Sequence, residues 1–237
     1  MPHRLSRAVV ITLFPLLLIQ ALPTISQAQV IKSGPPACPG IALTFDLCPV
    51  RKGEGYDKAL VDYLIEHKIP ATFFMSGRWI AKHDPEVERL LEMGFFEIGT
   101  HGAVHAHLAM QNAAEQREEI LGPVKILSEH YAHEAVLFRP PYGEYNDETI
   151  DIVRALGLRF IQWSIESGDP DPTLSTDQIL TRLAKRAKRG SIVVLHANGK
   201  GKQTHHVVQR LIDEVLPHKG LKPMTVSELL SCKQSIR

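Results

Sequence analysis

The sequence predicts a single α/β domain, folded as a distorted barrel of about seven parallel strands with outer helices. Continuously apolar runs alternate with segments of helical periodicity from residue 41 onwards, which is typical of parallel strands buried on both faces. The seven repeats follow one another without a linker or low-complexity stretch, which favours a barrel over an open sheet. A chain of 237 residues with 44% hydrophobic residues can bury a large core.

The expected elements follow from these patterns in order. Each predicted strand is a short apolar run, at 41–46, 71–75, 95–98, 135–138, 158–163 and 192–196, with a weaker one near 221–224. The predicted helices lie between them, at 57–67, 79–92, 111–131, 146–156, 176–189 and 204–216, and a terminal helix covers 225–230. Proline or glycine ends several helices before the next strand, at Pro70, Gly94, Gly157 and Gly190.

Residues 1–28 are predicted to be a secretory signal peptide. Two arginines precede an apolar run over 8–22, and Ser-Gln-Ala at 26–28 matches a small-x-small cleavage pattern. The run is shorter than the roughly 20 residues that a membrane span needs, although an uncleaved anchor is the alternative. We therefore expect a secreted or periplasmic protein with no stable membrane span after cleavage and a catalytic domain over 29–237.

The three cysteines and the charge limit the possible partners. An exported protein can form disulfides, and the odd count leaves one thiol over. Cys38 and Cys48 flank an extended run that holds them apart, so Cys38–Cys232 is the favoured bridge and two free buried thiols are the alternative. A net charge of +1 gives no sign of a nucleic-acid partner. We expect a monomer.

Polar side chains follow the predicted strands at one end of the barrel, where parallel barrels carry their chemistry. They are Asp46, the pair His101 and His105, Arg139, Glu166 with Asp169, and His196. Two histidines four residues apart on a helical turn can bind one metal, although such a pair is also common on surfaces.

Three of the other polar residues can serve in acid–base catalysis or have plain structural roles. Asp46 is a general base or a turn residue. Arg139 lowers the pKa of that carboxyl or forms a surface ion pair. His196 is a general acid, oriented by Asp169 or Glu166, or a core histidine.

Five ordered motifs resemble those of the polysaccharide deacetylase family, the chitooligosaccharide deacetylase homology domain of carbohydrate esterase family four. The resemblance covers about residues 38–230. Its motifs are Thr44-Phe45-Asp46-Leu47, His101 to His105, Arg139-Pro140-Pro141-Tyr142, Ser164 to Asp169, and Leu195-His196.

The resemblance implies metal-assisted hydrolysis of an N- or O-acetyl group on a sugar. It makes Asp46 the base, oriented by Arg139, and His196 the acid, with Asp169 tuning its pKa. It makes His101 and His105 ligands of a divalent metal, commonly zinc. The implied substrate contacts are Tyr142, whose backbone amide faces the oxyanion, Leu195 at the acetyl methyl, and Pro141 and Trp163.

Two positions depart from the family pattern. Leu47 stands where the family has an aspartate ligand, which leaves four alternatives. Asp46 becomes a ligand, His107 or another carboxylate completes the set, Cys48 approaches although one residue out of register, or metal binding is weak or absent. The Phe-Asp-Leu-Cys stretch is also expected to mark a subgroup. Pro170 replaces the usual tryptophan and Glu166 an aspartate, which predicts a more open sugar cleft.

The sequence therefore predicts an exported carbohydrate deacetylase whose partner is an acetylated glycan. Two alternatives remain at this point. One is a glycan-binding pseudoenzyme with a broken metal triad, and the other is a hydrolase of a non-sugar C–N bond.

Overall fold

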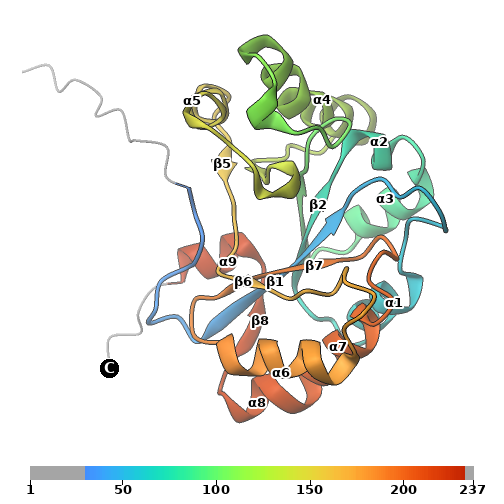
Figure 1. Ribbon diagram of the computed structural model, residues 1–237, viewed down its shortest axis with the longest axis vertical. Helices are drawn as coiled ribbons and strands as arrows, with labels where there is room; N and C mark the ends of the chain where they lie inside the picture. Colours follow the sequence, from blue (N-terminus) through green and yellow to red (C-terminus); the bar gives the residue numbers. More distant parts are fainter. Residues whose placement is uncertain (1–29, 233–237) are drawn as a thin grey trace, which may run out of the picture.

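The computed structural model describes residues 30–232 (Figure 1). The predicted signal peptide over 1–28 lies outside these residues. The described chain forms one sheet of eight strands that pair in parallel, in the order β5-β4-β3-β2-β1-β7-β6, and β8 pairs with the start of β1. The strands are β1 (Gly40–Leu47), β2 (Ala71–Met75), β3 (Phe96–Thr100), β4 (Leu137–Phe138), β5 (Arg159–Phe160), β6 (Ile165–Glu166), β7 (Ile192–His196) and β8 (Lys222–Met224).

The sheet curls into a barrel that does not close. Its two edges are β5 and β6, which follow one another in the chain but pair with opposite ends of the sheet. The N-terminal lead-in lies near this gap, where Ile31 bridges Ile161 and Ser33 bridges Ser191. The prediction of a distorted β/α barrel is confirmed, in the form of a curled, open barrel.

Helices surround the sheet, as predicted (Figure 1). They are α1 (Lys58–Glu66), α2 (Gly77–Ile80), α3 (Asp84–Glu92), α4 (Ala113–Tyr131), α5 (Asp147–Ala155), α6 (Thr176–Arg186), α7 (Thr204–Arg210), α8 (Leu216–His218) and α9 (Val226–Ser231). The predicted helix over 79–92 is instead two helices, α2 and α3. Proline favours the first turn of a helix, so Pro85 starts a new helix at Asp84 rather than continuing α2. None of the described helices is long and apolar enough to cross a membrane.

Local sequence explains where several helices begin. Four of them start with a reciprocal capping box, in which a polar side chain and the third helical residue bond each other's backbone N–H groups. The pairs are Asn112 with Glu115, Asn146 with Thr149, Ser175 with Gln178, and Thr225 with Glu228. These caps fix the helix starts and thereby the loops that follow the strands.

Alternation along the strands separates two apolar layers. Phe73 belongs to the large core between the sheet and its helices, whereas Phe74 belongs to a smaller cluster inside the barrel with Val226 and Leu229 of α9. The functional side chains lie at the carboxyl ends of the strands, where the guanidinium of Arg139 stacks over the Phe74 ring. The interior cluster therefore forms a rigid apolar floor beneath these residues.

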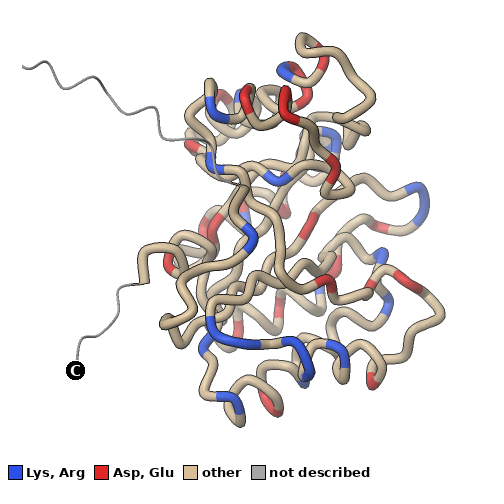
Figure 2. The backbone as a smooth tube through the Cα atoms, turned by 60° about the vertical axis from the view of Figure 1, so that its left-hand side comes forward, with Lys and Arg blue, Asp and Glu red and all other residues tan. Residues whose placement is uncertain are grey.

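The predicted disulfide is confirmed, since Cys38 and Cys232 are bonded across a sequence separation of 194 residues. The bond joins the segment before β1 to the end of α9. Cys48 is the remaining cysteine and is free and buried. Acidic and basic residues are interspersed along most of the described chain (Figure 2).

Candidate active site

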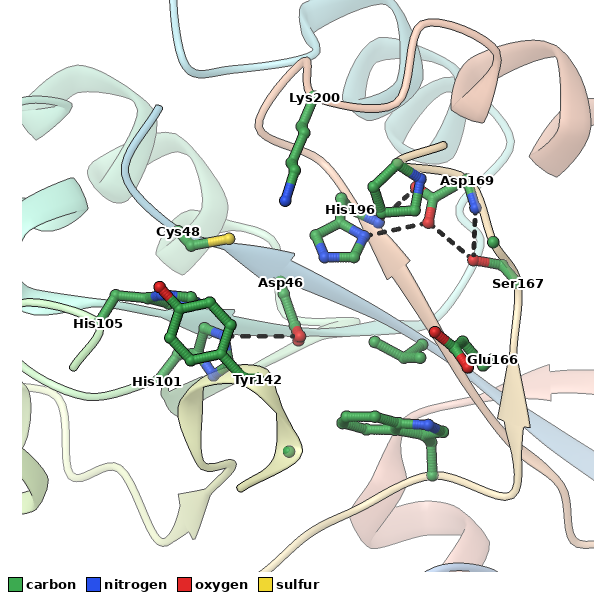
Figure 3. Close-up of a pocket in the computed structure, with 15 residues that line it drawn as sticks. Asp46, Cys48, His101, His105, Tyr142, Glu166, Ser167, Asp169, His196 and Lys200 are labelled. Carbon is green, nitrogen blue, oxygen red and sulfur yellow. Dashed lines mark hydrogen bonds and ion pairs between the residues drawn. The ribbon is translucent and has the colours of Figure 1, made fainter. Parts of the chain in front are cut away.

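A cavity of about 140 Å³ opens at the carboxyl ends of β1, β3, β6 and β7 (Figure 3). Five of the predicted catalytic and metal-binding residues line it: Asp46, His101, His105, Asp169 and His196. Pockets for whole drug-sized ligands measure about 300–1,000 Å³, so this cavity suits a small group such as acetamido rather than a complete sugar ring. The structure therefore brings together residues that are up to 150 positions apart.

Asp46 and Arg139 form a buried ion pair at the base of the cavity. Arg139 is fully buried, and its Nη1 donates to Asp46 Oδ1 at 2.7 Å. Burial alone would raise the pKa of Asp46, but the charge of Arg139, helped by His101 and His196, outweighs it and lowers the pKa. Asp46 is thus a carboxylate near neutral pH and can accept a proton.

His101 has a fixed tautomer. Its Nδ1 donates to the backbone carbonyl of Arg139 at 2.9 Å, and a carbonyl can only accept. The lone pair is therefore on Nε2, which lies 3.6 Å from Asp46 Oδ2. Burial lowers the pKa of His101, so the ring is neutral, as metal ligation requires.

His105 completes the predicted histidine pair. The two imidazole centroids lie 4.9 Å apart. Burial, followed by the proximity of the second imidazole at His101, lowers the pKa of His105 to about 3. Its backbone is in the left-handed region at φ 67°, which is unusual for a residue with a side chain. The turn that presents His105 must therefore be held by other contacts.

Glu119 of α4 provides those contacts. Its side chain is 5% exposed and accepts hydrogen bonds from the backbone N–H of Val104 at 3.0 Å and of Ala106 at 2.8 Å. Both residues flank His105. Gly102 belongs to the same arrangement, because a Cβ at its φ of +76° would lie 2.8 Å from Glu119 Oε1. Glu119 thus fixes the loop between the two histidines.

Cys48 is the third donor beside the two histidines. One ligand atom from each of Cys48, His101 and His105 lies within 4.8 Å of the others. Burial, followed by the charge of Asp46, raises the pKa of the Cys48 thiol to about 12. Of the four alternatives left by Leu47, approach of Cys48 is the one this geometry favours, because His107 is bonded to Glu144 at 2.8 Å instead.

Asp169 and His196 form the opposite side of the cavity. His196 Nδ1 donates to Asp169 Oδ1 at 3.0 Å, which leaves Nε2 for the cavity. Asp169 also accepts from the His196 backbone N–H, from Thr204 Oγ1 and from Ser167 Oγ. Burial alone would lower the pKa of His196, but Asp169 outweighs it and raises the pKa. Asp169, and not Glu166, orients His196.

The predicted substrate contacts divide into two groups. Tyr142 and Trp163 line the cavity, and the Tyr142 ring stacks on His107 with centroids 4.1 Å apart. Leu195 is instead fully buried in the large core, because neighbouring strand residues alternate sides and Val194 and His196 take the cavity side. Pro141 is also buried and does not line the cavity.

Comparison with known proteins agrees with this geometry. The sequence model of the polysaccharide deacetylase family matches residues 33–161. The chain belongs to the polysaccharide deacetylase family. It is 32% identical over 195 residues to a peptidoglycan-N-acetylglucosamine deacetylase of Bacillus cereus, covering 81% of this chain and 89% of that protein.

Solved polysaccharide deacetylase structures share the fold. The Bc1960 peptidoglycan N-acetylglucosamine deacetylase superimposes with a TM-score of 0.77 at 27% identity, covering 86% of this chain and 93% of that one. A pseudoenzyme of carbohydrate esterase family four from Bacillus anthracis has a TM-score of 0.77 at 23% identity, covering 87% and 70%, and shares the fold. This polysaccharide deacetylase is a hydrolase that acts on carbon–nitrogen bonds other than peptide bonds.

Family deacetylases depend on a metal, and the residues of this polysaccharide deacetylase fit one. Two neutral imidazoles and one sulfur converge, which is a donor set that zinc and related divalent metals accept. Glu119 lies in none of the five motifs and was therefore not predicted. The sequence signal that could have identified Glu119 is its helical spacing, which places this acid on the buried face of α4 beside Ile120.

Proposed function

We propose that this protein removes the acetyl group from N-acetylglucosamine units of an extracytoplasmic glycan. The observation that carries the proposal is the pairing of Asp46 with His196 at matched positions of β1 and β7. A carboxylate base and a histidine acid thereby face one cavity from adjacent strands. The similarity to peptidoglycan-N-acetylglucosamine deacetylases supports this substrate class.

In the proposed mechanism, Asp46 accepts a proton from the water that attacks the acetyl carbonyl. Arg139 holds the carboxylate in place through its 2.7 Å hydrogen bond. A divalent metal bound by His101 and His105 would supply Lewis acidity, which lowers the pKa of water and polarises the carbonyl.

Two other groups complete the proposed reaction. The backbone N–H of Tyr142, at a turn with φ 59°, would donate to the oxyanion. His196, protonated through its contact with Asp169, gives its Nε2 proton to the leaving amine as the C–N bond breaks.

The test is acetate release from oligomers of N-acetylglucosamine by the purified protein. We expect Asp46→Asn to lower the rate about 100- to 10,000-fold, the range that general base catalysis supplies. Asp171→Asn is the matched control, because Asp171 is an exposed carboxylate outside the cavity lining, and it should leave the rate unchanged.

Three other outcomes would contradict the proposal. Acetate release only from O-acetylated xylan would assign an esterase. Turnover of a non-sugar amide alone would assign a different C–N hydrolase. Oligomer binding without acetate release from any substrate would assign a glycan-binding pseudoenzyme.

A further inference from the structure

Cys48 directly follows the last residue of β1, and this position places its sulfur in the cavity. Successive residues of a strand point to opposite sides, so positions 46 and 48 share a side and position 47 faces the other way. Asp46 lines the cavity, Leu47 is fully buried in the large core, and Cys48 lines the cavity. Figure 3 shows the sulfur directed toward the same space as the two histidines.

The nitrogen that faces Cys48 lacks a partner of its own. His101 is 2% exposed, and its Nδ1 is occupied by the Arg139 carbonyl. In residues 30–232, the structure gives Nε2 no hydrogen bond, and its contact with Asp46 is 3.6 Å long. His101 lines the cavity with this lone pair free, so a cation between Nε2, His105 and Cys48 would bind it.

Asn198 holds the sulfur in position. Its Nδ2 donates to the backbone carbonyl of Cys48 at 3.0 Å and to Sγ at 3.2 Å. Its Oδ1 accepts from the backbone N–H of Lys200 at 3.1 Å, which fixes the amide orientation. Residues that orient metal ligands commonly bond them in this way. An amide donor to sulfur also stabilises negative charge on it.

We propose that Cys48 supplies the third protein ligand, as a thiolate, to a zinc ion that His101 and His105 also hold. This inference rests on the proposed function and names its metal site. The thiol proton leaves to solvent as the sulfur–metal bond forms. The thiolate carries the single negative charge that an aspartate ligand would carry, so it compensates for Leu47. Three protein ligands leave one tetrahedral position for water, as in catalytic zinc sites.

Cobalt substitution tests the ligand directly. The protein is stripped of metal, loaded with Co²⁺ and examined by absorption spectroscopy. We expect one equivalent of cobalt and a near-ultraviolet thiolate-to-cobalt charge-transfer band. Stoichiometric cobalt without that band, or no cobalt binding at all, would overturn the inference.

Two variants keep the test decisive. Cys48→Ser should lose the band and bind metal at least tenfold more weakly, whereas Cys48→Asp should bind metal without the band. Thermal unfolding of each variant checks that it is folded. Unchanged metal affinity in Cys48→Ser would contradict the proposal even if that variant unfolds more easily.

The results also separate this inference from the proposed function. Acetate release by a protein without the charge-transfer band would retain the deacetylase and reject Cys48 as a ligand. A clear band with no acetate release from any substrate would retain the ligand and reject the deacetylase.

Discussion

The two sides of the cavity differ in how completely their polar groups are paired (Figure 3). On the His196 side, Asp169 accepts hydrogen bonds from His196, Thr204 and Ser167, and both of its carboxylate oxygens are occupied. On the His101 side, one ligand atom from each of His101, His105 and Cys48 lies within 4.8 Å of the others. The structure gives no hydrogen bond between these three side chains in the described residues.

This difference indicates two ways of preparing a site. A saturated network holds His196 in one orientation before substrate arrives, and such preorganisation favours proton transfer. Donor atoms that converge on the cavity without bonding one another are available to a cation. Substitutions on the His101 side should therefore alter metal affinity. Substitutions on the His196 side should alter the pH dependence of the reaction rate.

Arg139 supports the His101 side through Asp46, and its removal should have the largest effect. Arg139→Met leaves the Asp46 carboxylate buried and unpaired, which costs about 3–5 kcal/mol of unfolding free energy. Urea unfolding measures the loss. Arg154→Met is the control, because Arg154 pairs with Asp151 near the surface and such pairs contribute about 0–1 kcal/mol. Equal losses in the two variants would contradict the prediction.

Glu119 sharpens the comparison because it acts only on the His101 side. Glu119→Gln keeps the side-chain volume but removes the negative charge and replaces Oε2, which accepts from the N–H of Val104 at 3.1 Å, by an NH2 group. We expect metal affinity to fall about 10- to 100-fold, as measured by competition with a chelating dye, while the pH profile at saturating metal stays unchanged. Glu115→Gln, in the cap of the same helix, should not alter metal affinity.

Substitution of Asp169 should change the pH dependence of the rate and leave metal affinity unchanged, and it should have the smallest effect of the three. Because Asp169 raises the pKa of His196, the acid stays protonated to higher pH, and activity should fall as pH rises through that pKa. Asp169→Asn removes the charge and should move this falling limb to lower pH by about one unit, or 1.4 kcal/mol. Ser167→Ala keeps the charge and should move it less. The pH dependence of kcat measures this shift. The metal affinity of both variants should equal that of the unsubstituted protein.

Much of the fold could be predicted because hydrophobic periodicity is local. The apolar runs at 41–46, 71–75 and 192–196 match β1, β2 and β7 closely. The two-residue strand β6 was not predicted because Ile165 and Glu166 belong to no apolar run, whereas the two-residue strands β4 and β5 lie inside longer apolar runs. The gap between β5 and β6 also depends on distant packing that short windows do not contain.

The site was predicted by motif, and its exceptions have physical reasons. Asp46, His101, His105, Asp169 and His196 converge as expected. Leu195 does not reach the cavity because of strand alternation, and the same alternation brings Cys48 into it. Counting sides along 194–196 would have predicted the placement of Leu195, and counting sides along 46–48, rather than aligning position 47, that of Cys48. Asn198 required the structure, because its partner is 150 residues away.

The Cys38–Cys232 bond has a mechanical consequence. Tension applied between the segment before β1 and the segment after α9 passes through this covalent link, and the strands between the two cysteines carry no load. Pulling with an optical trap should therefore show no barrel-unfolding extension while the link is intact. After reduction, the same force acts along β1 and α9, and the barrel becomes the element that yields.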